Sequence, residues 1–186
     1  VLREPLESGV IVISRAAGRL QFPARFQLVA AMNPCPCGYL GDPGGRCSCS
    51  TEQVQRYRAK LSGPLLDRID LHVSVAREPT SLRRSENRGP NSAQVRELVV
   101  AARNRQQYRQ GCCNSQLDLD SLHQHCRLTD ADRLWLEQAC ERLQLSLRAS
   151  HRILKVARTI ADLDEAAHIN RKHLAEALQY RTQLNT

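Results

Sequence analysis

Two pairs of cysteines lie within one short loop-forming stretch, and this arrangement limits what the surrounding chain can become. Each pair has the spacing Cys-x-Cys, and nine residues rich in glycine separate the pairs, Cys35/Cys37 and Cys47/Cys49. Glycines allow the tight turns that bring thiols together, and four convergent thiols are typical of a tetrahedral zinc site. The sequence therefore predicts a closed structural Zn²⁺ site, with unligated thiols and disulfides as the alternatives.

The absence of a secretory signal and the close Cys-x-Cys pairing favour reduced thiols over disulfides. No run approaches the roughly 20 apolar residues of a membrane span, and no basic segment precedes an apolar core as in a secretory signal. We therefore expect a cytoplasmic protein without a membrane partner, because disulfides are rare in that compartment. The remaining cysteines form no obvious second site, and they are Cys112, Cys113, Cys126 and Cys140.

Positive charge is concentrated in the middle of the chain. The net charge is +8, and residues 79–110 carry seven Lys/Arg against two Asp/Glu, whereas residues 111–186 carry ten of each. A local excess of this kind suits an acidic partner such as nucleic acid. A solvated linker followed by a solvated helix face explains the same charges without any partner.

The first part of the chain has the patterns of an α/β fold. Residues 10–14 are mostly β-branched and residues 19–22 alternate between polar and apolar, which together predict a β-hairpin. Residues 26–32 form an apolar run that reads as a buried strand, and residues 71–75 read as a further strand.

After this part the pattern changes to that of helices. Residues 77–91 have the composition of a linker, and the helices that follow are predicted to begin near Ser92, Thr129, Ser146 and Asn170. We therefore expect a partial α/β core over residues 1–76, with a Cys-rich loop at 34–50, and an all-α helical bundle over residues 92–186. Because the first residues read as a helix already under way, we also expect a fragment of a longer protein.

Three polar residues occupy positions at which ligand chemistry can sit. Asn33 directly follows the predicted buried strand, where ligands bind in α/β folds, although an Asn-Pro turn explains it equally. Arg68 either forms an ion pair with Asp67 or Asp70 or reaches the phosphate of a neighbouring subunit. Arg148 lies in the first turn of a helix, where an anion would offset its unfavourable interaction with the helix dipole, or it belongs to a solvated basic face.

Together with the stretches around them, these residues resemble the AAA+ ATPases. The resemblance is narrower with the magnesium-chelatase-like subfamily and, within it, with the group of the competence protein ComM (YifB). The stretches that carry it span nearly the whole chain, and they are residues 2–9, 23–38, 61–71 and 145–163. The resemblance implies a partial AAA+ core with a β-hairpin before sensor 1, followed by a helical lid domain of the magnesium-chelatase C-terminal type.

The resemblance also implies a role for each candidate residue. Asn33 would be sensor 1, which positions the attacking water; Arg68 would be the arginine finger toward the adjacent subunit's ATP; and Arg148 would be sensor 2 of the lid. The hairpin would touch DNA in the pore of a ring, with Arg15 and Arg19 flanking its turn as phosphate contacts. A solvated turn is the alternative for these two arginines.

The sequence departs from the family pattern in one respect. It contains no Gly-x-x-x-x-Gly-Lys-Ser/Thr motif and no preceding acidic Walker B strand, so we expect ATP and Mg²⁺ to bind only the intact protein and this portion alone to be inactive. The resemblance implies the sensor and lid portion of a hexameric DNA motor that extends heteroduplex by branch migration during natural transformation and recombination. Two alternatives remain: a non-catalytic zinc-stabilised nucleic-acid-binding module, and a regulatory ATPase subunit of the chelatase type.

Overall fold

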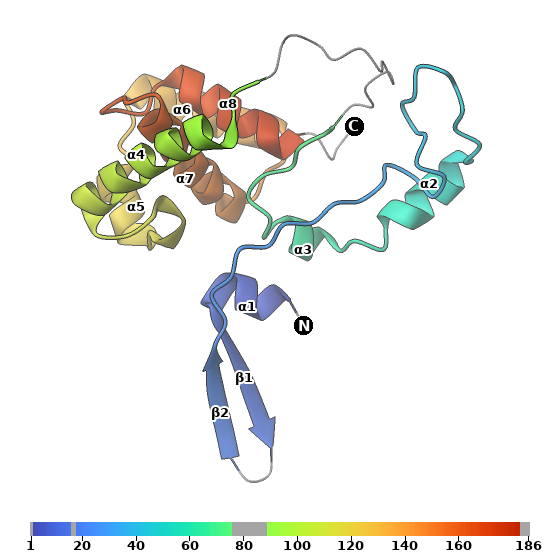
Figure 1. Cartoon of the computed structure of the whole chain (residues 1–186), viewed down its shortest axis with the longest axis horizontal. Coiled ribbons are helices and arrows are strands. Elements are labelled where there is room, and N and C mark those ends of the chain that lie inside the picture. The colour runs from blue at the N-terminus through green and yellow to red at the C-terminus, as the bar shows by residue number, and fades with distance from the viewer. Residues whose placement is uncertain (1, 16–17, 76–88, 183–186) are drawn as a thin grey trace. The chain divides into compact units, whose positions relative to one another are not determined.

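The computed structural model describes residues 2–15, 18–75 and 89–182, and these divide between Ile69 and Asp70 into two compact units (Figure 1). Each unit is described by itself. The predicted linker over residues 77–91 falls almost entirely outside the described residues. The coarse fold prediction is confirmed, because a small antiparallel sheet near the start of the chain is followed by a set of helices.

A short helix and a β-hairpin open the first unit. Helix α1 (Arg3–Ser8) ends at Gly9, whose left-handed backbone (φ 69°) lets its N–H donate to the carbonyl of Pro5 at 3.0 Å. Strands β1 (Val10–Arg15) and β2 (Gly18–Pro23) then pair antiparallel. The hairpin predicted from the alternation of residues 10–22 is therefore confirmed.

The register of the hairpin separates its two faces. Ile11 pairs with Phe22 and Ile13 pairs with Leu20, and because neighbouring side chains point to opposite faces of a strand, these four share one face. Each of them is between 40% and 63% exposed. The hairpin therefore presents one apolar face to its surroundings.

Two predicted strands are absent from the structure. Residues 26–32 and 71–75 are irregular, and Val29 and Val75 are 84% and 87% exposed. A strand is defined by its ladder partner, and the described residues provide no strand beside either segment. Both segments are apolar, but the prediction of strands at residues 26–32 and 71–75 was wrong for this structure, as was the prediction that the strand at 26–32 is buried.

Two further helices complete the first unit. Helix α2 (Thr51–Arg58) begins with a capping box, in which the side chains of Ser50 and Gln53 each accept a hydrogen bond from the other residue's backbone N–H. Helix α3 (Gly63–Leu66) is a single turn with Pro64 near its start.

Six helical segments make up the described part of the second unit (Figure 1), and α7 contacts α4, η1, α5 and α8. They are α4 (Ser92–Gln110), the 3₁₀ turn η1 (Asn114–Gln116), α5 (Leu119–His125), α6 (Asp130–Arg142), α7 (Leu147–Leu163) and α8 (Arg171–Thr182). The caps predicted at Thr129 and Ser146 are confirmed, whereas the cap of α4 is Asn91, one residue before the predicted Ser92. No helix among the described residues has both the length and the apolar character needed to cross a bilayer.

The core of the second unit is built around one face of α7. Ile153, Ala157 and Ala161 are at most 1% exposed, and they pack with Leu122 of α5 and Leu174 of α8. The small alanines allow α8 to approach α7 closely, which suits the antiparallel packing of a helical bundle.

A buried polar network joins α4, η1 and α7. The carboxylate of Asp162, which is 1% exposed, accepts hydrogen bonds from Arg109 (2.6 and 3.0 Å) and Asn114 (2.8 Å) and pairs with the buried guanidinium of Arg158 (3.0 Å). Burial alone would raise the pKa of Asp162, but these hydrogen bonds and charges lower it below its usual value. Asp162 is therefore ionised and satisfied inside the bundle.

Replacing Asp162 by Ala should destabilise the helical unit by about 3–5 kcal/mol, because it leaves buried guanidinium groups without their carboxylate. The matched control is Glu165→Gln, which removes the carboxylate of an exposed pair with Arg105 and should cost less than about 1 kcal/mol. Denaturant unfolding followed by circular dichroism measures both. If both variants lost the same small amount of unfolding free energy, the buried network would contribute no more to stability than an exposed ion pair.

The same network predicts a dependence of stability on pH. Because the pKa of Asp162 is lower in the folded state than in the unfolded state, its contribution is complete above about pH 4 and is lost as the pH falls below that. Asp162→Asn should therefore be less stable at neutral pH and lose less further stability on acidification than the parent protein. Parallel pH profiles for the two proteins would contradict this assignment.

Candidate metal centre and predicted site residues

The four cysteines of the Cys-rich loop converge in the structure. Cys35 and Cys37 lie in a tight turn in which the N–H of Gly38 donates to the carbonyl of Cys35 at 3.0 Å, and Gly38 adopts φ 80°. The chain then folds back so that Cys47 and Cys49 lie against the first pair, just before the cap of α2. The glycines thus provide the turns that the sequence predicted for them.

The distances between the sulfurs fit a tetrahedral metal site. Cys35 Sγ lies 3.3 Å from Cys37 Sγ and 3.8 Å from Cys47 Sγ, and Cys37 Sγ lies 3.6 Å from Cys47 Sγ. All four Sγ atoms, including that of Cys49, lie within 4.8 Å of one another, and none is in a disulfide. A Zn–S bond of about 2.3 Å in tetrahedral geometry requires S–S distances of roughly 3.8 Å, so the cluster is compatible with Zn²⁺.

Backbone groups favour thiolates in this cluster. The N–H groups of Tyr39 and Ser48 lower the pKa of Cys37 to about 6. The N–H of Cys37 acts in the same direction on Cys49, but the neighbouring thiols of Cys37 and Cys35, together with burial, raise the pKa of Cys49 to about 11. Four thiols so close together cannot all ionise without a cation among them, and Zn²⁺ would supply that positive charge.

An ion pair supports the loop between the cysteine pairs. The carboxylate of Asp42 accepts from Arg46 at 2.7 and 2.9 Å, and the guanidinium of Arg46 lies 5.0 Å from the centre of the Tyr39 ring. The i, i+4 spacing of the opposite charges was a signal for this pair that the sequence analysis did not use. Four protein ligands and a braced loop describe a structural site, since no coordination position is left for a substrate.

Asn33 lies beside the metal centre. Its side chain is exposed, it precedes Cys35 by two residues, and a Cβ atom added to Gly38 would lie 3.7 Å from its Cγ. The first turn of the Cys-rich loop therefore packs next to the residue predicted as sensor 1. A metal that fixes this turn would also fix the backbone that leads out of Asn33.

Arg68 is held by a residue that the sequence analysis missed. Its Nε and Nη2 donate to the carboxylate of Glu7 at 3.1 and 2.5 Å, and its Nη1 donates to the carbonyl of Pro64 at 2.7 Å. The side chain of Arg68 is only 14% exposed. No local signal identifies Glu7, because it lies 61 residues away along the chain.

Arg148 lies in the first turn of α7, as predicted, and its side chain is exposed. The side chains of the predicted solvated basic face of this helix do not all point into solvent. Arg152 forms an ion pair with Asp70, and Lys155 donates to the carbonyl of Ser115 at 3.1 Å. Burial lowers the pKa of Lys155. Of these three residues Arg148 is exposed, whereas Arg152 and Lys155 are half-buried.

The structure thus brings the four cysteines together but distributes the other candidates. Asn33 and Arg68 belong to the first unit and Arg148 to the second. Arg15 and Arg19 lie near the hairpin turn, opposite Gly18 and Ser14 respectively. Strand alternation places Arg15 on the apolar face and Arg19 on the other face, so the two arginines point in different directions.

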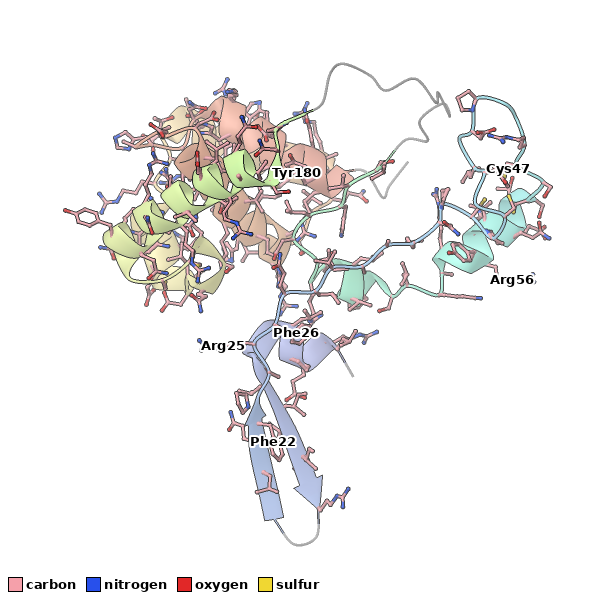
Figure 2. The ribbon with its side chains drawn as sticks, in the orientation of Figure 1. Phe22, Arg25, Phe26, Cys47, Arg56 and Tyr180 are labelled. Atoms are coloured by element: carbon pink, nitrogen blue, oxygen red, sulfur yellow. The ribbon has the colours of Figure 1, made fainter. Side chains whose placement is uncertain are left out.

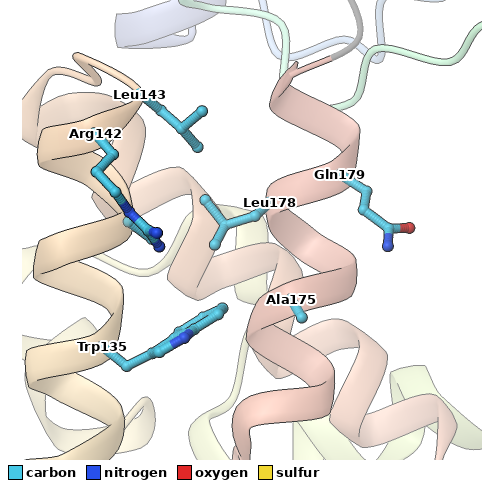
Figure 3. Close-up of a pocket in the computed structure, with 7 residues that line it drawn as sticks. Trp135, Arg142, Leu143, Ala175, Leu178 and Gln179 are labelled. Atoms are coloured by element: carbon cyan, nitrogen blue, oxygen red, sulfur yellow. The ribbon is translucent and has the colours of Figure 1, made fainter.

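A hollow in the second unit lies between α6 and α8 and contains none of the predicted site residues. It has a volume of about 470 Å³, and Figure 3 shows Trp135 and Leu178 facing each other across it, with Arg142 and Leu143 nearby. Its lining is mostly apolar, and the guanidinium of Arg171 lies 5.7 Å from the centre of the Trp135 ring. Arg142 is the one charged residue of its lining, so this hollow lacks the converging set of charged groups that phosphate chemistry requires.

Comparison with known proteins finds matches over almost the whole chain. The family model described as magnesium chelatase, subunit ChlI, matches residues 1–82, and that of the ChlI C-terminal part matches residues 89–181. Competence protein ComM of Haemophilus influenzae is 51% identical over 184 residues, which cover 98% of this chain and 36% of ComM. Protein YifB of Escherichia coli is 48% identical over 181 residues, which cover 97% of this chain and 35% of YifB. The chain thus spans about a third of the length of these relatives.

The metal centre makes a direct prediction. Protein purified without chelator should contain about one Zn²⁺ per chain, and Cys35→Ser should reduce this to a small fraction, because three ligands cannot close the tetrahedron. The matched control is Cys113→Ser, which removes a thiol outside the cluster and should leave the zinc content unchanged. Elemental analysis, with thiol titration on the same samples, measures both.

Protein that has four reactive thiols in the cluster and no zinc would contradict the prediction. The bound zinc should also be released as the pH falls, because protons compete for the thiolates.

Proposed function

This chain belongs to the family of magnesium chelatase subunit ChlI, and we propose that it is the sensing and lid portion of a nucleotide-driven DNA motor of the ComM type. The observation that carries the proposal is the 51% identity to ComM over 98% of this chain, which includes the stretches around Asn33, Arg68 and Arg148. The remaining part of such a protein would hold the phosphates of ATP and the Mg²⁺ that neutralises their charge.

The three candidate residues would act on the γ-phosphate by placing charge and hydrogen bonds. Asn33 would orient the water that attacks phosphorus while the bond to the ADP oxygen breaks. Arg68 would stabilise the charge that develops on the oxygens, from the neighbouring subunit of a hexameric ring, because a planar cation suits phosphate. Arg148, exposed at the start of α7, would bring the lid onto the nucleotide.

The hairpin would be a DNA contact of the motor. Arg15 and Arg19 lie beside its turn and are exposed, and a projecting two-stranded ribbon with basic residues at its end can reach a phosphate backbone. In the ring, hydrolysis would move these hairpins and thus the DNA, as branch migration in the cytoplasm requires. The Cys-rich loop would have a structural role, holding the turn beside Asn33.

Replacing Glu7, the partner of Arg68, distinguishes an arginine finger from a purely structural role of Arg68. In the intact protein, Arg68→Ala should reduce DNA-stimulated ATP hydrolysis by roughly 10³-fold or more while nucleotide binding changes little. Glu7→Gln removes the partner of Arg68 but keeps its guanidinium, so it should retain most of the activity. Steady-state hydrolysis and binding of a fluorescent nucleotide measure the two effects.

If Glu7→Gln were as inactive as Arg68→Ala, the ion pair itself would be what matters, and the finger assignment would fail. Hydrolysis that DNA does not affect would favour a regulatory ATPase of the chelatase type over a DNA motor.

The hairpin contacts make a separate prediction about salt. Arg15→Gln and Arg19→Gln in the intact protein should each weaken duplex binding and lower the slope of log K against log salt by about 0.9. Gln21→Ala is the matched control on the strand of Arg19 and should leave the slope unchanged. Fluorescence anisotropy at several salt concentrations measures the slope, and unchanged slopes in both arginine variants would exclude the hairpin as a phosphate contact.

A further inference from the structure

We propose that the Cys-rich module, residues 34–60, carries a second DNA contact, a groove between the metal centre and α2 that takes single-stranded DNA. This inference rests on the proposed function, because it names a further site for the same ligand. The proposed groove is a different surface from the hairpin that carries Arg15 and Arg19.

The groove is formed by the loop on one side and one face of α2 on the other. It has a volume of about 630 Å³ and is lined by Pro36, Cys37, Ser48, Cys49, Gln53, Arg56, Tyr57 and Lys60. Figure 2 shows Arg56 on α2 and Cys47 in the loop that precedes this helix. Gln53 and Arg56 lie three residues apart on α2, so they share one face of the helix, and Lys60 lies in the turn that follows the end of this helix.

Apart from the two cysteines of the metal centre, the charged side chains that line the groove are cations. Within the module Arg46 is bound by Asp42, whereas Arg56 and Lys60 line the groove and are exposed. Glu52, the module's other acid, lies in the first turn of α2 and is not part of the groove lining. Two cations that line the same groove repel one another, and an anion bound between them would offset that repulsion.

Aromatic and polar groups adapt the groove to a nucleotide. The ring of Tyr57 lines it, and the ammonium of Lys60 lies 6.0 Å from the centre of that ring. Stacking of a base on an aromatic ring beside phosphate-binding cations is the usual way in which proteins hold single strands. A groove of about 630 Å³ is of the size of small-ligand sites and admits a nucleotide, whereas a duplex is too wide to enter it.

The metal centre itself provides the strongest competing explanation. Four thiolates around one Zn²⁺ leave two negative charges, and Arg56 and Lys60 could serve only to balance them. Backbone N–H groups already lie against the sulfur of Cys37, which spreads this charge without any side chain. If Arg56 and Lys60 contact DNA, their variants lose DNA binding and keep zinc. If they only balance the charge of the metal centre, their variants lose zinc, so DNA binding and zinc content must be measured on the same protein.

The test uses the intact protein and a labelled oligothymidylate as the single-stranded probe. The double variant Arg56→Gln/Lys60→Gln should bind this probe roughly tenfold more weakly at low salt. It should also lower the slope of log K against log salt by about 1.4, because each lost phosphate contact lowers it by about 0.7. The matched control is Arg58→Gln, which removes a charge from the same helix outside the groove lining and should change neither quantity. Zinc content and thermal unfolding are measured on every variant.

The possible outcomes are distinct. A loss of single-strand binding with zinc retained, seen for the double variant Arg56→Gln/Lys60→Gln but not for Arg58→Gln, supports the groove. Equal losses in both variants, a loss only for a duplex probe, or a loss that follows zinc release overturns it. If the parent protein binds no DNA at all, the proposed function fails together with this inference, whereas binding that none of the groove variants changes overturns the groove alone.

Discussion

The convergence of four cysteine sulfurs is the interaction on which the first unit depends most. Among its described residues only Pro5, Cys35 and Val54 are buried, so hydrophobic burial contributes little to holding the loop between residues 34 and 50 in place. Small units of this kind are usually stabilised by a metal or by covalent links. The sulfur cluster fixes the turn next to Asn33 on one side and the start of α2 on the other, and therefore both the proposed sensor and the proposed groove depend on it.

Features that depend on neighbouring residues were predicted from the sequence, and features that depend on distant residues were not. The hairpin, the caps at Thr129 and Ser146, and the Cys-x-Cys pairs are encoded within short segments, where turn chemistry and capping decide the structure. The pairing of Arg68 with Glu7 joins residues 61 positions apart, and no local pattern identifies such a partner. The apolar run at 26–32 was misread as a buried strand because a run of this kind requires neighbouring strands, which the described residues do not supply.

The chain that follows Arg68 contacts the helices of the second unit from Asp70 onward. Asp70 forms an ion pair with Arg152 of α7, and the N–H of His72 donates to the carbonyl of Tyr180 of α8 at 2.8 Å. These contacts lie two and four residues beyond Arg68.

The central proposal is that Asn33 would act on the nucleotide of its own subunit and Arg68 on that of its neighbour. Intact proteins carrying Asn33→Ala or Arg68→Ala should each be inactive alone. Mixed in equal amounts and allowed to exchange subunits, they should regain hydrolysis, because roughly one interface in four pairs an intact Asn33 with an intact Arg68 in a heterologous ring. The measurement is the ATP hydrolysis rate of the mixture against those of its components, and a rate no higher than that of the inactive components would contradict the account.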